Sequence, residues 1–586
     1  MKTAQQILAT LAAAGAALAI AAPASAADTL YNGANADDLV AWTNAMSTRL
    51  TIAAGDTVAI TNGTFDVSFG NVRAANFGDG STFAVLKDAS ILVSASPGPS
   101  LRPFGFVLTG FGSCLDVDGG TLRLAVGSSY YPFATSSENA TVIVRNGGLM
   151  GRRTTDMAGM YTRLQGTNNV LAVLDGGTFD SVTEVGTSDS TYSRTFAIVN
   201  AVGCRFAVTN ATLKQRNTLR IGTATSRAVG NEVTFHDATI QFATGSGTQN
   251  RGKSLVLDAL ALSNAVTVSG SAGSFGFDAV EIGGTNNLFD IACGTAATFA
   301  KPVTLSGSGN TVRLSGYRWA NDGWFPKFGA GEDMTLDVPG TLVTVRYDDQ
   351  FITSGFTFSG TNATVRVRDG GILGSFNTLT GGRHCLKFTP GATKNFTLSV
   401  EDGGAVILSN SVNQVYTDSG IRYNWTNCPN SSIAFSGRNP KFMIGASSVY
   451  RSIILGTKDE EPLPDAVALV FEIPPEGWAE APMESLADSE FILYGNQPIV
   501  VRESAALAKA KHVRMRVPLI HAVRGFYLEP NNTHSLKAPL DAERVAKLNA
   551  AATLPEGAFL RYDAAAMTLF VELPNTRRNA TVFTLR

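Results

Sequence analysis

Apolar and polar residues alternate along much of the chain, in short segments separated by glycine-rich turns. In the segment 362–375, Val365 and Val367 alternate with Arg366 and Arg368, which is the period of a strand with one buried face and one exposed face. The Asp-Gly-Gly sequence at 369–371 tolerates positive φ angles and precedes a second apolar pair. The segment therefore predicts a strand, a corner and a second strand.

The same unit recurs at 139–150, 169–179 and 395–407. Its corner position can be followed, at steps of 27 to 35 residues on either side of a central region, through Asp88, Asp118, Asn146, Asp175, Asn210, Asp237, Asp369 and Asp402. In that region, between about 240 and 360, the coil register is not fixed, and the corner candidates are Ser269, Cys293, Ser315 and Asp337. A repeat of this length made of strands predicts a parallel β-solenoid.

An asparagine lies six or seven residues before most corners, at Asn139, Asn169, Asn231, Asn287, Asn362 and Asn395. Neighbouring strands of a sheet lie about 4.8 Å apart. Equivalent asparagines on successive coils can therefore hydrogen bond to one another in a ladder. We expect one such ladder along the solenoid.

These repeats resemble those of a known family. The leading asparagine, the alternating Val-x-Val and the Asp-Gly-Gly corner are similar to the repeats of bacterial right-handed parallel β-helix proteins, the pectin-lyase-like superfamily, and especially to autotransporter passenger regions. The resemblance covers about 57–455 and implies an all-β, right-handed parallel β-helix. It does not imply one activity, because the fold hosts lyases, hydrolases, adhesins and structural coats.

The flanking sequence predicts an export signal and a cap. Residues 1–26 have the charged start, short apolar core and small-residue cleavage site of a signal peptide. Residues 27–56 form the predicted N-terminal cap, with an amphipathic helix at 37–46 whose apolar side is Leu39, Val40 and Trp42. We therefore expect a secreted or bacterial cell-surface protein.

The β-helix is expected to span 57–456. A charged, proline-containing segment at 456–465 ends the visible repeats and predicts a boundary. Residues 457–586 then form a small β-rich C-terminal domain, with strands at 467–473, 491–494, 559–562 and 568–573 and a helix at 541–551. This domain is too short for the membrane barrel that ends an autotransporter, so the sequence does not support self-export by this one chain. No stretch after the signal approaches the roughly 20 apolar residues of a transmembrane helix, so we expect no membrane insertion.

Net charge bears on the possible partners, and cysteine spacing bears on whether the chain has disulfides. With 46 basic and 48 acidic residues the chain is nearly neutral, and no nucleic-acid partner is expected. Four of the five cysteines recur at steps of 90, 89 and 92 residues, and the five are Cys114, Cys204, Cys293, Cys385 and Cys428. We interpret them as small buried side chains at equivalent inward positions rather than as a disulfide framework.

Motifs for chemistry are sparse. Residues 247–254 match the phosphate-binding loop pattern Gly-x4-Gly-Lys-Ser, but they lie between coils rather than between a strand and a helix, so no nucleotide is expected. A resemblance to the galacturonan hydrolases of this fold would imply a Gly-His-Gly sequence and paired aspartates on one face. Asp348 and Asp349 are the one adjacent pair within the predicted β-helix, and neither His236 nor His384 is flanked by glycines. No metal-ligand spacing stands out, and no metal or other cofactor is expected.

Aromatic insertions between strands are the first candidate binding site, comprising Tyr317, Trp319, Trp324, Phe325, Tyr423 and Trp425. Exposed rings on loops stack against sugars, although such rings also pack down as local plugs. Both interpretations stay open. The first function considered is therefore an exported, non-enzymatic scaffold or adhesin that contacts extracellular polysaccharide or cell-surface components.

A basic stretch is the second candidate, centred on Arg205, Lys214, Arg216 and Arg220. Stacked coils could bring these residues together against an anionic polysaccharide, whereas their irregular spacing favours separate solvated side chains. The alternative function is a polysaccharide lyase or glycoside hydrolase with its site here. An enzyme must bring a base and carboxylate-binding groups together, whereas a scaffold disperses its charges.

Overall fold

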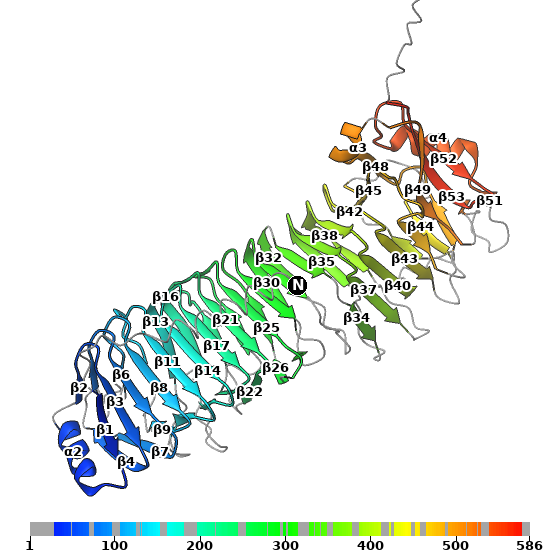
Figure 1. Ribbon diagram of the computed structural model, residues 1–586. Coiled ribbons are helices and arrows are strands. Elements are labelled where there is room, and N and C mark those ends of the chain that lie inside the picture. Colours follow the sequence, from blue (N-terminus) through cyan, green and yellow to red (C-terminus); the bar gives the residue numbers. More distant parts are fainter. Residues whose placement is uncertain are drawn as a thin grey trace, which may run out of the picture. The chain divides into compact units, whose positions relative to one another are not determined.

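The computed structural model divides the chain into two compact units, Met1–Thr218 with Ala238–Arg251 and Leu219–Asp237 with Gly252–Arg586. Within each unit, successive strands pair in parallel with the equivalent strand of the next coil, as Figure 1 shows. This arrangement confirms the predicted all-β parallel β-helix class.

The structure describes residues 28–47, 50–69, 75–95, 106–124, 129–130, 132–152, 161–180, 196–216, 218–243, 254–272, 274–277, 279–292, 297–299, 303–314, 327–332, 334–339, 342–347, 356–377, 386–411, 421–423, 427–446, 452–456, 465–486, 490–510, 512–523, 526–528 and 538–576.

The first unit contains three series of parallel strands. The first series is β1 (Asp28–Asn32), β3 (Thr57–Thr61), β6 (Thr82–Val85), β8 (Cys114–Asp118), β11 (Thr141–Arg145), β14 (Val170–Leu174) and β17 (Arg205–Thr209). The second is β4 (Gly63–Phe69), β7 (Ala89–Ala95), β9 (Thr121–Leu124), β12 (Leu149–Arg152), β15 (Thr178–Asp180), β18 (Thr212–Arg216) and β22 (Thr239–Ala243). The third is β10 (Ser129–Tyr130), β13 (Tyr161–Thr167) and β16 (Phe196–Val202), and β2 (Leu50–Ile52) pairs with β5 (Ala75–Phe77).

The second unit repeats this plan. Its first series is β21 (Glu232–His236), β25 (Ala265–Ser269), β28 (Leu288–Ala292), β31 (Thr311–Leu314), β33 (Thr335–Pro339), β36 (Thr364–Arg368), β39 (Thr397–Glu401), β42 (Ser432–Ser436), β45 (Ala468–Ile473) and β48 (Ile499–Glu503). A further series is β34 (Leu342–Tyr347), β37 (Ile372–Asn377), β40 (Ala405–Ser411), β43 (Lys441–Ala446), β46 (Met483–Ser485) and β49 (Met515–His521).

The remaining series of the second unit close each coil. One is β19 (Leu219–Ile221), β23 (Leu255–Leu257), β27 (Val280–Ile282), β30 (Val303–Ser308), β32 (Lys327–Glu332), β35 (Phe356–Thr361) and β38 (Leu386–Lys394). Another is β41 (Ile421–Tyr423), β44 (Ser452–Leu455), β47 (Glu490–Leu493) and β50 (Phe526–Leu528). Two short pairs complete the set, β20 (Ala228–Val229) with β24 (Ala261–Leu262) and β26 (Ser274–Phe277) with β29 (Ala297–Phe299).

The period-two pattern sets which side chains enter the core. In β36, Val365 and Val367 are buried while Arg366 is exposed, as the sequence predicts. Aromatic rings also enter the core of the first unit, where Phe196 on β16 stacks on Phe206 on β17 with ring centroids 4.4 Å apart. Burial of these apolar faces is the main stabilising contribution to each coil.

The N-terminal helix forms close to its predicted position. Helix α2 spans Ala36–Ser47 and buries Trp42 against Tyr31, Phe65 and Phe83. Val40, predicted on the apolar side, is exposed instead. The indole therefore supplies the main apolar contact of the helix with the first coils.

Most predicted corners have the expected left-handed backbone. The φ angle is positive at Asp88, Asn146, Asp175, Asn210, Asp237, Asp369 and Asp402. Three predictions are wrong. Asp118 ends β8 and the positive φ falls on Gly119, while Asp337 lies in the middle of β33 and is buried. Aspartate suits both a corner and a polar strand face, so residue type alone did not separate them. Ser269 fails in the same way as Asp118, because it ends β25 and the positive φ falls on Gly270. Cys293 and Ser315 lie outside the described residues.

The leading asparagines form two adjacent stacks, not the single ladder expected from the sequence. In the second unit the inner stack is buried directly before strands of the first series and contains Asn231, Asn264, Asn287 and Asn310. In the first unit, Asn169 has the same position directly before β14. In the second unit the outer stack is exposed, has positive φ, lies one position earlier in its coil, and contains Asn286, Asn362, Asn395 and Asn430. In the first unit, Asn139 and Asn168 have this position. The spacings of six and seven residues before the corner correspond to these two stacks.

The two stacks bond differently. In the inner stack, the backbone N–H of Asn231 donates to Oδ1 of Asn264 at 3.0 Å, and that of Asn264 donates to Oδ1 of Asn287 at 2.8 Å. Each amide oxygen thus satisfies a buried donor one coil earlier. In the outer stack, Nδ2 of Asn395 donates to Oδ1 of Asn362 at 2.8 Å in an exposed position.

The cysteines do not share one inward position. Cys114 is a half-buried first residue of β8, whereas Cys204 is buried immediately before β17. Cys428 is also buried, and the other two cysteines lie outside the described residues. The separation of 90 residues between Cys114 and Cys204 therefore does not mark equivalent positions.

Parallel coils continue past the expected domain boundary. β45 and β48 pair in parallel with the coil before each of them, so the proline-containing segment at 456–465 connects two strands of the same solenoid. Antiparallel pairing begins where β53 (Thr568–Leu573) joins β49 and where β51 (Ala538–Pro539) joins β50. The predicted domain start at residue 457 therefore does not coincide with the end of the parallel coils.

The terminal elements match the sequence closely. β52 (Phe559–Asp563) and β53 coincide with the predicted strands and pair in antiparallel. Helix α4 (Ala542–Ala551) has Asp541 as its N-cap, whose carboxylate accepts from the backbone N–H of Arg544. A second short helix, α3 (Ala505–Ala510), had no expected counterpart.

Candidate functional site

Charged side chains of alternating sign line the outward face of four successive strands in the second unit. Asp290 on β28, Arg313 on β31, Asp337 on β33 and Arg366 on β36 are register partners in that order. We call this set the charged column. Neighbouring strands lie about 4.8 Å apart, which brings each side chain within reach of the next.

Asp337 is the centre of the charged column. Its side chain is 6 % exposed and accepts from Nε of Arg313 at 3.2 Å. From β36, Arg368 binds it with two parallel bonds, Nε to Oδ1 at 2.9 Å and Nη2 to Oδ2 at 2.9 Å. The hydrogen bonds that Arg368 donates to the Asp337 carboxylate are the main cause of the raised pKa of Arg368. A buried carboxylate is thus held by two guanidinium groups.

The ends of the charged column are paired as well. Nη1 of Arg313 lies 3.5 Å from Oδ2 of Asp290. Nε of Arg366 lies 3.1 Å from Oε1 of Glu401, which also accepts from the hydroxyl of Ser399 at 2.7 Å. These charges therefore hold neighbouring strands together, and a ligand would have to displace those partners to reach them.

The first unit has a smaller ion-pair cluster of the same kind. Nη2 of Arg145 lies 2.8 Å from Asp116 and 3.1 Å from Asp118 on the preceding coil. Burial raises the pKa of the Asp116 carboxyl, and it raises the pKa of the nearby Cys114 thiol to about 12. Cys114 is therefore protonated at neutral pH and unsuited to act as a nucleophile.

The basic stretch is divided among strands of three different sheets. Arg205 begins β17 and is exposed, and Lys214 is half-buried on β18, which also carries Arg216. Arg220 lies on β19, with Nη1 3.5 Å from Asp258. The side chain of Arg216 is outside the described residues.

The aromatic candidates fall almost entirely outside the described residues. This holds for Tyr317, Trp319, Trp324, Phe325 and Trp425. Tyr423 is the last residue of β41, and its side chain is likewise not described. The prediction that these rings bind sugars therefore stays a prediction.

The histidines are engaged in local contacts. His236 lies 3.0 Å from the hydroxyl of Ser269 and 3.3 Å from Asp237. His512 is buried, with Nε2 3.0 Å from Glu503 and Nδ1 2.9 Å from the carbonyl oxygen of Val513. His384 and the Asp348-Asp349 pair lie outside the described residues.

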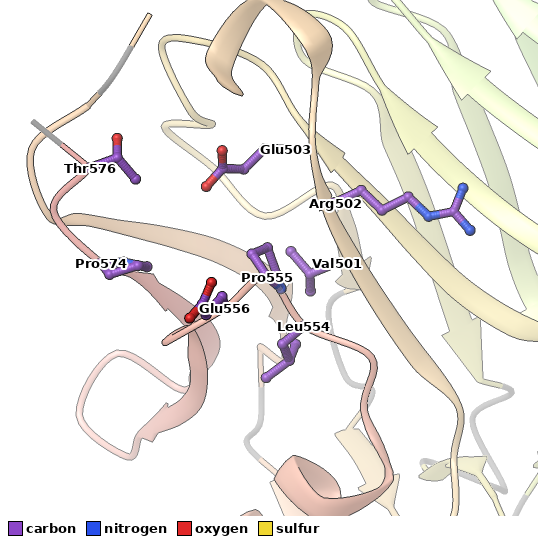
Figure 2. A pocket seen from close by; sticks show the side chains of 8 residues that line it. All are labelled: Val501, Arg502, Glu503, Leu554, Pro555, Glu556, Pro574 and Thr576. Carbon is purple, nitrogen blue, oxygen red and sulfur yellow. The ribbon is translucent and has the colours of Figure 1, made fainter. Parts of the chain in front are cut away.

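A groove of about 480 Å³ lies in the C-terminal region of the second unit. It is lined by Val501, Arg502, Glu503, Leu554, Pro555, Glu556, Pro574 and Thr576, which Figure 2 shows. Its residues come from β48, from the segment between α4 and β52, and from the segment after β53. We call it the C-terminal groove.

Sequence reasoning missed both the charged column and the C-terminal groove. The column had a readable signal, because its members stand three residues after Asn287, Asn310, Met334 and Ala363, which occupy the inner-stack position. Using the inner asparagines as the register anchor would have aligned Asp290 with Arg313 on successive coils. The groove had no such signal, because its walls are far apart in the sequence.

Within the described part of the chain, no three His, Cys, Asp or Glu side chains gather closely enough to hold a metal ion. None of the helices among the described residues is long and apolar enough to span a membrane.

Comparisons of the chain with protein-family models, curated proteins and solved structures found no match.

Proposed function

We propose that this protein is an exported, non-enzymatic parallel β-helix, a surface or extracellular scaffold or adhesin. The observation that carries the proposal is the binding of Asp337 by Arg313 and Arg368. Outward-facing charges on these coils bind one another across the strands, as in a structural role. A lyase instead needs a base and carboxylate-binding groups that converge on the substrate.

Export rests on the sequence of residues 1–26, with cleavage before Ala27. Expression of the full chain in a bacterial host with a general secretion pathway tests it, by intact mass of the protein recovered outside the cytoplasm. The proposal expects a mature chain that starts near Ala27. Recovery of the uncleaved chain in the cytoplasm alone would contradict it.

Glycan contact is assigned to the aromatic insertions rather than to the basic stretch. A ring stacked on a sugar contributes about 0.5–1.5 kcal/mol, so a loop with several rings supports weak binding that salt does not screen. Trp319 and Trp324 lie within one insertion, whereas the basic residues belong to strands of different sheets. Repetition of the protein on a surface would strengthen such binding through avidity.

The test is a screen of the purified mature chain on neutral and anionic glycans at low and high salt. Trp319→Ala and Trp324→Ala should each weaken binding about two- to tenfold. Phe111→Ala removes an exposed ring elsewhere and is the matched control. Binding confined to anionic glycans, abolished by salt and lost in Arg205→Ala or Lys214→Ala would instead favour the polysaccharide lyase or glycoside hydrolase.

A further inference from the structure

The floor of the C-terminal groove contains the outer edge of β48. On its inner side this strand pairs with β45, and Ser504, directly after it, donates its N–H to the carbonyl of Ile473 at 3.0 Å. On the outer side the segment after α4 runs beside it. Val501 donates to the carbonyl of Thr553 at 2.8 Å, and Thr553 donates to that of Ile499 at 2.9 Å.

This outer pairing stops after one residue for a chemical reason. Backbone groups of a strand point alternately to its two sides, so the C=O of Val501 and the N–H of Glu503 face the same side as the N–H of Val501. The residue that would continue the pairing is two positions beyond Thr553, and it is Pro555. Proline has no N–H to donate to the Val501 carbonyl. Among the residues that the structure describes, neither group has a backbone partner.

The side chains around this open edge define what fits beside it. Val501, Leu554, Pro555 and Pro574 form apolar walls, and Thr576 adds a hydroxyl. Glu503 and Glu556 contribute carboxylates, while Figure 2 shows Arg502 extending away from the other lining residues. The charge that the groove presents to a ligand is therefore negative.

We propose that the C-terminal groove docks an extended peptide segment of a partner protein that carries a lysine or arginine side chain. One residue of the segment donates its N–H to the Val501 carbonyl and accepts from the Glu503 N–H, as Thr553 does one step earlier along β48. Its basic side chain lies against Glu556 and the free side of the Glu503 carboxylate. This is strand addition to an open edge, with specificity from flanking side chains.

The test measures fluorescence anisotropy of a labelled Thr-Val-Lys-Val-Thr peptide with the full mature chain. We expect saturable binding that weakens as salt is raised. A peptide with glutamate in place of lysine, and a peptide N-methylated on the lysine amide, should each bind at least tenfold more weakly. The N-methyl group removes the donor that the Val501 carbonyl needs.

Protein variants separate the groove from nonspecific acidic surface. Glu556→Gln should weaken binding about two- to fivefold, because Glu556 is exposed. Glu476→Gln, at another exposed carboxylate, should leave binding unchanged. Equal affinity for the N-methylated peptide would overturn the strand pairing. Absence of saturable binding at millimolar peptide, or equal weakening by both variants, would overturn the docking site.

Discussion

Arg368 reaches across one coil to Asp337, and its Nε and Nη2 each lie 2.9 Å from a different carboxylate oxygen. Arg366, two residues earlier on the same strand, turns to Glu401 on the other side from a position that is 47 % exposed. The two arginines look equivalent in the alternating pattern, yet only Arg368 contacts a buried charge.

Arg368→Ala should lower the free energy of unfolding by about 1–3 kcal/mol, because Asp337 keeps only Arg313 to neutralise it. Arg366→Ala is the matched control and should change it by at most about 1 kcal/mol, as is usual for an exposed ion pair. Urea unfolding followed by circular dichroism measures both. Equal urea midpoints for the two variants would show that Arg368 contributes no more to stability than Arg366 does.

The inner asparagine stack should matter more than the outer one. Asn264→Ala removes the oxygen that accepts from the buried Asn231 N–H and the amide that donates to Asn287, at an expected cost of about 2–4 kcal/mol. Asn286→Gly, in the neighbouring outer stack with φ 54°, keeps a backbone angle that glycine adopts freely and should be close to neutral. Thermal unfolding of the two variants compares them. A larger loss of stability in Asn286→Gly than in Asn264→Ala would show that the outer stack contributes more to stability than the inner stack.

Asp237 should give the fold an acid-sensitive contribution. The backbone N–H of Ala272, with help from that of Ser271 and from His236, holds the pKa of this carboxyl below its usual 3.8. Since the folded pKa is depressed, the stabilisation is present above pH 3.8 and is lost as the pH falls through the folded pKa.

Asp237→Asn has no charge to lose at this site. The stability advantage of the natural chain over this variant should therefore shrink between neutral pH and about pH 3. Melting temperatures of both proteins across this range provide the measurement. Parallel curves would mean that the Asp237 contacts do not favour the charged form.

The phosphate-loop pattern should bind no nucleotide. Its last residue, Ser254, is buried and leads into strand β23, whereas a phosphate loop opens a helix whose N–H groups hold the phosphates. Calorimetry with ATP and magnesium should give no saturable heat, and Lys253→Ala should titrate like the natural chain. Micromolar binding that disappears in Lys253→Ala would contradict this expectation.

Local rules predicted the repeating unit well. Alternation at Val365 and Val367 fixed the inward face of β36, and the tolerance of aspartate for positive φ located corners such as Asp369 and Asp402. The sequence also predicted a helix at 541–551, where α4 forms with Asp541 as its N-cap. Each of these depends on a few adjacent residues, which is why the sequence alone was sufficient.

Features that depend on register between coils were harder to predict. Asp337 suits a corner as well as a strand, and only its alignment with Arg313 and Arg366 shows that it belongs to the charged column. Likewise, the segment at 456–465 has the composition of a linker, yet β45 pairs with β42 beyond it. Insertions of variable length shift the register, and no local signal reports that shift.

Catalysis on an anionic polysaccharide is the most direct test of the proposed non-enzymatic role. The purified mature chain is incubated with polygalacturonate and other uronate polymers, with absorbance in the ultraviolet followed for unsaturated products and reducing ends assayed in parallel. A scaffold whose outward charges are paired across coils, as Asp337 is with Arg368, should release neither kind of product above the buffer control. Sustained release that is lost in Arg216→Ala or Arg220→Ala would contradict the scaffold and establish an enzyme on this fold.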